Sequence, residues 1–70
     1  MSNSGATLRA LRVARGWDQA DLAMRSKVSL RTIWGIEAGR VSPRATTRRK
    51  LLAALRIEWE AQADVFGPLG

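Results

Sequence analysis

The sequence predicts an all-α domain, a compact bundle of four to five short helices. Two observations carry this prediction. Apolar residues recur at intervals of three and four along most of the chain, which is the spacing of one helix face. Residues that start and stop helices, such as Ser, Asp, Gly and Pro, separate these stretches. The 70 residues allow one domain, in which nearly every large apolar side chain must serve a single core.

The first predicted helix covers about residues 7–15 and follows a flexible tail over residues 1–6. Leu8 and Leu11 share one face of this helix. Thr7 is the expected N-cap. Gly16 is expected directly after the C-terminus, where a left-handed residue ends many helices.

A second helix is predicted over about residues 18–25. Asp18 can accept a hydrogen bond from the first turn, and Asp21 is the matching acid of a capping box. Trp17 and Leu22 lie at the spacing of a hydrophobic staple, so we expect Trp17 to face the core.

A third helix is predicted over residues 29–38, with Ser29 as its N-cap and Gly39 as the residue that ends it. Ile33 and Ile36 point toward the core when residues are placed at intervals of about 100°. Two short, separately capped helices joined by a tight turn form a helix-turn-helix.

The C-terminal part has apolar residues at helical spacing without an internal Gly or Pro. A fourth helix is predicted over about residues 44–55, and Trp59, Ala63 and Phe66 continue the spacing beyond it. The pattern also allows one continuous helix from 44 to 66. The stripe of Trp59, Ala63 and Phe66 is a candidate dimer contact, and its alternative role is to close the core.

Charge gives the strongest indication of a partner. The chain has 12 Lys and Arg residues, ten of them Arg, against 6 Asp and Glu residues, and its formal net charge is +6. All twelve cations lie in residues 1–56 with three of the acids, which gives this part a net charge of +9. A basic body rich in Arg favours nucleic acid as the partner, and a solvated basic surface is the alternative.

The same composition argues against several other functions. The absence of Cys and His removes thiolate metal sites, the commonest metal ligand and the usual general base. We therefore expect no cofactor, no metal and no enzymatic activity. No apolar run approaches the roughly 18 residues of a membrane span, and the N-terminus lacks the apolar stretch of a signal peptide. We expect a cytoplasmic protein with no membrane partner.

The outer face of the third predicted helix combines one cation, one aromatic residue and small residues. Opposite the two isoleucines lie Arg31, Trp34, Gly35 and Ala38, flanked by Leu30 and Thr32. In the DNA major groove, Arg can bind guanine through a fork of donors and apolar atoms can contact a thymine methyl, while small residues let the helix approach the bases. The alternative places Trp34 in a seam between helices or in a dimer contact.

Together these residues resemble the Cro/C1-type helix-turn-helix domains, also called the XRE family, of phage repressors and bacterial regulators. The stretch "DQADLA" is similar to the family's "TQEELA", and "VSLRTIWGIEAGR" is similar to "VSRSTISRIERGR". The stretch "SPRATTRRKLLAAL" is similar to "PSLETLLRLARAL". The resemblance covers about residues 7–57 and implies a lambda-repressor-like fold that binds double-stranded DNA.

The resemblance also implies roles for individual residues. Leu30, Arg31 and Gly35 match positions that touch bases, and Trp34 matches a position near the backbone or the groove wall. Because Trp34 also lies on the outer face of the helix, we expect it to contact bases with the other three. Contacts with phosphates or the minor groove are expected from Gln19, Ser29, Thr32, Arg40 and Arg44, and Gln19 also braces the recognition helix. Arg12 and Glu37 match a buried ion pair between the first and third helices, where an unpaired carboxylate would be costly.

Two positions depart from the family pattern. Lys27 occupies the turn position that is usually Gly, which requires either a left-handed Lys or a different turn. Arg48 replaces a usual apolar residue, and with Arg49 and Lys50 it resembles an added phosphate contact; the alternative is a solvated charged face.

These observations predict a sequence-specific DNA-binding transcriptional regulator, and we expect a repressor. Residues 7–57 form the DNA-binding domain, the helix 29–38 enters the major groove, and residues 58–70 form a C-terminal helix and tail with a candidate dimer contact. The resemblance implies a bacterial or phage-encoded homodimer that binds an inverted-repeat operator. The alternative is an antitoxin-like or other interaction module whose C-terminal segment binds a partner protein.

Overall fold

The computed structural model describes residues 4–69, and this part of the chain consists of helices joined by turns and loops. The α-helices are α1 (Ser4–Ala14), α2 (Gln19–Ser26), α3 (Leu30–Glu37), α4 (Ala45–Leu55) and α5 (Gln62–Phe66). A short 3-10 helix, η1 (Trp59–Ala61), precedes α5. The predicted all-α bundle of four to five short helices is confirmed for the described residues.

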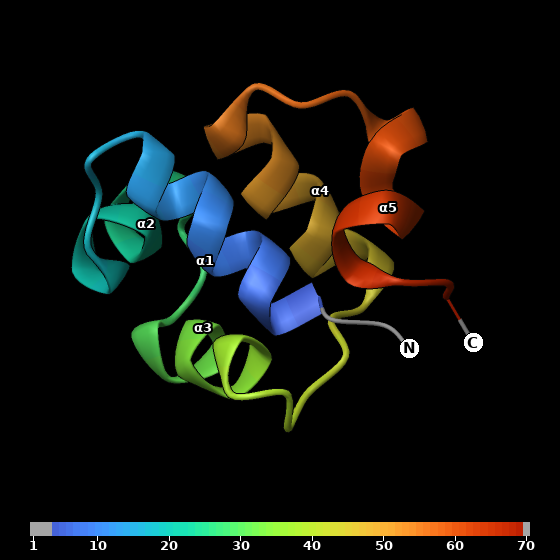
Figure 1. The fold of residues 1–70 in the computed structure, drawn as a ribbon, viewed down its shortest axis with the longest axis horizontal. Helices are drawn as coiled ribbons and strands as arrows, with labels where there is room; N and C mark the ends of the chain where they lie inside the picture. Colours follow the sequence, from blue (N-terminus) through green and yellow to red (C-terminus); the bar gives the residue numbers. More distant parts are fainter. Residues whose placement is uncertain (1–3, 70) are drawn as a thin grey trace.

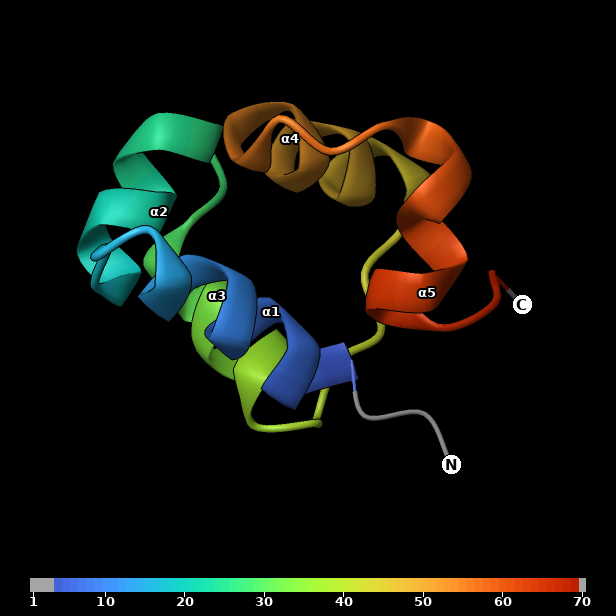
Figure 2. The same ribbon diagram turned by 45° about the horizontal axis from the view of Figure 1, so that its top comes forward.

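The helices surround one core (Figures 1 and 2). α1 packs against α3 and α5, and α2 packs against α3 and α4. In Figure 2, α4 lies along one side of the molecule and α1 and α3 lie along the other, with α2 and α5 at the two ends. Helices as short as these are marginal alone in water, so packing against each other is what stabilises them.

Buried apolar side chains from all five α-helices and from the turn before α3 form the core. These side chains are Leu8, Leu22, Val28, Ile33, Ile36, Leu51, Leu52, Leu55, Val65 and Phe66. Trp17 is partly buried and packs against them, as its staple position predicts. Complete burial of one such side chain contributes about 1.5–3 kcal/mol. This core supports α3 from behind and leaves its opposite face free.

The N-terminal helix α1 begins one turn earlier than the sequence predicts. Thr7 lies inside α1, so the prediction that it caps the helix is wrong. The predicted tail boundary after residue 6 is also wrong, because the helix begins at Ser4; residues 1–3 lie outside the described range. Leu8 is fully buried.

The helix-turn-helix of α2 and α3 has the predicted caps. Asp18 accepts a hydrogen bond from the backbone N–H of Asp21 at 2.7 Å, and the Asp21 carboxylate accepts one from the N–H of Asp18 at 3.0 Å. Ser29 accepts a hydrogen bond from the N–H of Thr32 at 3.1 Å. Lys27 is left-handed, with a φ of 60°, which is the first of the two alternatives for this turn.

The chain does not continue as one helix from 44 to 66. α4 ends at Leu55, and Arg56 takes the left-handed conformation with a φ of 58°. The N–H of Ile57 donates to the carbonyl of Leu52 at 2.9 Å, which closes the end of the helix. A continuous helix would carry residue 66 about 16 Å beyond the end of α4. The break instead returns α5 to α1, where its apolar residues complete the core.

Candidate nucleic-acid interface

The outer face of α3 is exposed, and the core supports the helix from behind. Ile33 and Ile36 are fully buried on the inner face. On the outer side, Arg31 is exposed and Trp34 keeps 53% of its surface exposed, while Leu30 is half-buried. Val41, 46% exposed, lies beside the same face, so two exposed apolar side chains make it a candidate surface for a partner.

Ser29 and Thr32 organise the first turn of α3. The Ser29 hydroxyl accepts the backbone hydrogen bond that caps the helix, and it donates to Oγ1 of Thr32 at 2.8 Å. Ser29 is exposed and Thr32 is half-buried. The pair therefore fixes the start of α3, and the predicted phosphate contacts of both residues stay predictions.

Glu37, at the C-terminal end of α3, is held by side chains from α1 and α2. Arg12 donates through Nε to Oε2 at 2.8 Å and through Nη2 to Oε1 at 2.9 Å. Gln19 donates through Nε2 to Oε1 at 3.0 Å, and the Nε of Arg9 lies 3.5 Å from the same oxygen. The predicted ion pair of Arg12 and Glu37 is therefore present, and Gln19 does brace α3. The predicted phosphate contact of Gln19 stays a prediction.

The environment of Glu37 keeps its carboxylate charged. Only 1% of the side chain is exposed. This burial raises the pKa of Glu37, but the hydrogen bonds from Arg12 and Gln19 and the positive charge of Arg12 outweigh it, so the net pKa lies below its usual value. The hydrogen bond to Glu37 raises the pKa of Arg12 despite desolvation. α3 is therefore oriented within the free protein, and binding need not order it.

Gly35 is explained by the loop that follows α3. The N–H groups of Arg40 and Val41 donate to the carbonyl of Gly35 at 2.9 and 3.2 Å, so the chain folds back along this helix. A Cβ atom at position 35 would lie 2.8 Å from Cγ2 of Val41, which is closer than Cβ atoms are found in proteins. The expectation that Gly35 leaves room for bases therefore needs correction, because Val41 fills that space.

All exposed charged side chains on α3 and in the segments that flank it are cations. Lys27 precedes the helix, Arg31 lies on it, and Arg40 and Arg44 follow it, and all four are exposed. The only acid in this stretch is Glu37, which is buried and paired. A surface of this composition attracts the phosphates of nucleic acid.

Arg48 is the clearest correction to the predicted site. It is fully buried, so it does not form the predicted phosphate contact. Its guanidinium donates through Nε to the carbonyl of Pro43 at 2.8 Å, and through Nη1 to the carbonyl of Gly67 and to Oε1 of Gln62. Burial lowers the pKa of Arg48. This side chain thus joins the loop after α3 to the C-terminal segment through neutral oxygen acceptors.

The fold also divides the predicted dimer stripe. Phe66 is 2% exposed and belongs to the core, so the prediction that it contacts a second copy is wrong. Trp59 is half-buried, and the guanidinium carbon of Arg49 lies 4.1 Å from its ring centroid. Ala63 is exposed. The three residues do not form one exposed stripe: Trp59 belongs to the 3-10 helix η1, whereas Ala63 and Phe66 belong to α5, where Ala63 is exposed and Phe66 is buried.

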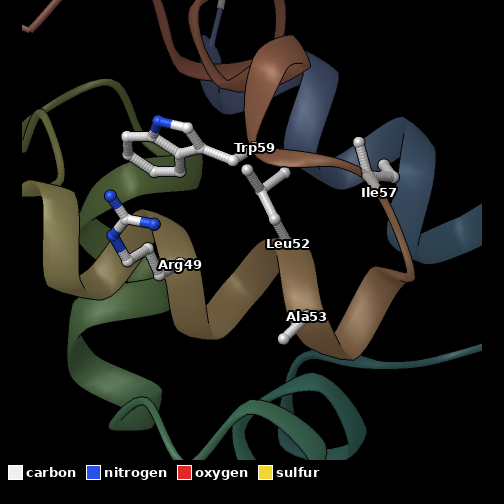
Figure 3. Close-up of a pocket in the computed structure, with 5 residues that line it drawn as sticks. All are labelled: Arg49, Leu52, Ala53, Ile57 and Trp59. Atoms are coloured by element: carbon white, nitrogen blue, oxygen red, sulfur yellow. The ribbon is translucent and has the colours of Figure 1, made fainter.

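A hollow of about 180 Å³ lies beside the Trp59 ring (Figure 3). It is lined by Arg49, Leu52, Ala53, Ile57 and Trp59. Figure 3 shows Arg49 from α4 beside the indole ring, with Leu52 next to it. The lining offers apolar surface and one cation but no acid–base pair. The described residues also hold no group of three His, Cys, Asp or Glu side chains that could bind a metal.

Two contributors to the site were missed from the sequence, and the burial of Arg48 could have been foreseen. Arg9 reaches the Glu37 network from one turn before Arg12, which is a helical spacing that points to the same partner. Val41 had no local signal, because only the fold of the loop places it on Gly35. The burial of Arg48 did have a local signal, because position 48 lies on the same helix face as Leu51, Leu52 and Leu55.

The capped α2–turn–α3 unit and its cationic outer surface define a helix-turn-helix DNA-binding domain. Residues 5–65 match the family described as "Helix-turn-helix domain", and the chain belongs to this family, within the Cro/C1-type class. Membership indicates a DNA-binding regulator. No curated protein and no solved structure matches the chain. Within residues 4–69, no helix is long and apolar enough to span a membrane.

Proposed function

We propose that this protein is a sequence-specific transcriptional repressor that inserts α3 into the DNA major groove. The observation that carries the proposal is the exposed outer surface of α3 and its flanks, where every exposed charged side chain is a cation, on a helix that the Arg12–Glu37 pair holds from behind. A rigid helix of this kind does not have to be ordered on binding, which favours affinity.

In this proposal, the residues of α3 and its flanks divide into readers and phosphate contacts. Leu30, Arg31 and Trp34 face the bases, and Arg31 forms a fork of hydrogen bonds with a guanine. The phosphate contacts are Gln19, Ser29, Thr32, Arg40 and Arg44. Arg48 has no direct role, because it is buried.

We also propose that two copies bind an inverted repeat with half-sites about one helical turn apart. Phe66 is not available for the dimer contact, so the remaining candidates are Ala63 and the exposed part of Trp59. The family is generally non-enzymatic, and we propose no reaction for this chain.

The interaction-module alternative receives less support. Val65 and Phe66 of the C-terminal segment are buried in the protein's own core and are not available to a partner protein. The exposed acids of that segment, Glu58, Glu60 and Asp64, remain as a surface for a basic partner. Purification that yields a stable complex with a second protein, with no sequence-selective DNA binding, would favour this alternative.

The experiment that tests the proposal is selection of bound duplexes from a random DNA pool, with the mass of the complex measured in solution. We expect one enriched inverted repeat and a mass of two protein copies per duplex. Lys50→Ala removes an exposed cation on α4, outside the proposed base readers. It controls for loss of one positive charge and should enrich the same motif. Failure to enrich any sequence contradicts sequence-specific binding, and one copy per duplex contradicts the dimer. Placed beside a promoter, the enriched site should lower reporter expression when the protein is present.

A further inference from the structure

The loop after α3 supplies an apolar side chain to the surface that faces DNA. One methyl of Val41, Cγ2, lies where a side chain on residue 35 would begin. Two backbone hydrogen bonds to the Gly35 carbonyl hold the loop there, and 46% of Val41 remains exposed. Val41 therefore stands in for the side chain that Gly35 lacks.

Few polar side chains on this surface are free to read bases. The Ser29 hydroxyl caps α3 and donates to Thr32, and Glu37 is buried in its ion pair. On the outer face of the helix itself, Arg31 is exposed and offers several donors, and Trp34, 53% exposed, offers one indole N–H donor. Sequence preference carried by this face must then come from these two donor side chains and from apolar contacts.

The charged residues around Val41 indicate which kind of partner binds this surface. Arg40 directly precedes Val41 in the loop and Arg44 directly precedes α4, and both side chains are exposed. An apolar side chain among exposed arginines, with no exposed acid between Lys27 and Arg44, lies on a surface that attracts a polyanion. It fits a DNA groove, where cations bind phosphates and apolar atoms contact the methyl group of thymine.

We propose that Val41 is a specificity-determining residue that contacts the 5-methyl group of a thymine in the major groove. This inference rests on the proposed function, since it requires that α3 lies in that groove. Loss of one buried methyl is worth about 0.8 kcal/mol, or about fourfold in affinity.

The test replaces each thymine of the enriched site, one at a time, by deoxyuridine, which lacks only that methyl. We expect the parent protein to bind one of these duplexes about fourfold more weakly. Val41→Ala should bind that duplex and the thymine duplex equally. Val13→Ala, at an exposed valine on α1, removes the same atoms elsewhere and should keep the parent's discrimination.

Three outcomes would overturn the inference. They are an enriched site that contains no thymine, equal binding of every deoxyuridine duplex by the parent, and unchanged discrimination by Val41→Ala. Any of these leaves the proposed function intact, because the parent still prefers its site to a scrambled duplex. A parent protein with no such preference overturns the proposed function itself. A melting curve for Val41→Ala that matches the parent's shows that the variant is folded.

Discussion

Arg12 on α1 holds Glu37 on α3 through two hydrogen bonds of 2.8 and 2.9 Å across 25 residues of sequence. The carboxylate belongs to the inner side of the helix whose outer side we propose to read DNA. This one pair therefore couples the stability of the domain to the orientation of its recognition helix.

Substitution of Glu37 by Ala should lower stability by about 3–5 kcal/mol, because it leaves the Arg12 charge buried without its partner. For a domain of this size, each kcal/mol corresponds to about 4–8 °C in melting temperature. Glu60→Ala is the matched control, since Glu60 is exposed, and it should change little. Equal melting temperatures for the two variants would show that the pair contributes no net stability.

Stability should also fall in acid because of Glu37. Its pKa in the folded protein lies below its usual value, so the stabilisation is present above about pH 4.3, the unfolded value, and is lost as the pH falls through the folded pKa. Urea denaturation at pH 7 and pH 3 measures this loss. Glu37→Gln cannot titrate there, and its deficit relative to the parent should shrink at pH 3. A deficit of the same size at both pH values would contradict the assignment.

Arg31 and Arg44 should have separable effects on DNA binding. Arg31→Ala should cost about 1–3 kcal/mol on the enriched site and relax the preference at one base pair. Arg44→Ala should weaken all sequences alike and reduce the salt slope by about 1. Titrations with the site, its single-base variants and a salt series measure both effects. A uniform loss for Arg31→Ala, with base preference unchanged, would mean that α3 does not read through Arg31.

Arg48 should act on stability and not on the salt dependence of DNA binding. Arg48→Met removes the donors to the loop carbonyl of Pro43 and to the C-terminal carbonyl of Gly67. Each buried acceptor left without a donor costs about 1–3 kcal/mol. Lys50→Ala on the same helix is exposed and should melt like the parent. Were Arg48→Met to melt normally and lower the salt slope by about 1, the original phosphate-contact prediction would be restored.

Gly35 and Val41 should be energetically coupled. In the parent, Gly35→Ala gains helix propensity of about 1 kcal/mol but places its Cβ against Val41 Cγ2. In a Val41→Ala background, the nearest Val41 atom that remains is Cβ at 3.5 Å, an ordinary contact distance. Gly35→Ala should therefore stabilise that background by about 1 kcal/mol and the parent by clearly less. Identical effects in both backgrounds, measured by urea denaturation, would refute the coupling.

The sequence by itself predicted the helix-turn-helix because its caps depend on interactions between residues close in sequence. The capping box of Asp18 and Asp21 and the cap at Ser29 join residues three positions apart. Their spacing can therefore be recognised in the sequence without knowledge of the fold. The inner face of α3 was readable for the same reason, because helical spacing alone puts Ile33 and Ile36 together. Helical spacing also put Glu37 near the core side of α3, where it needs a cationic partner, and the family resemblance identified that partner as Arg12.

Contacts between distant segments decided the rest. Helical spacing placed Arg48 on an apolar stripe, but its acceptors lie in a loop and at the C-terminus. The turn at Arg56 follows from the gain of bringing α5 back to the core, which outweighs a left-handed cost of about 1–2 kcal/mol for a residue other than Gly. Val41 reaches Gly35 only because the loop folds back. Sequence spacing encodes which residues share a helix face, whereas burial depends on which segments meet, and that is a property of the whole fold.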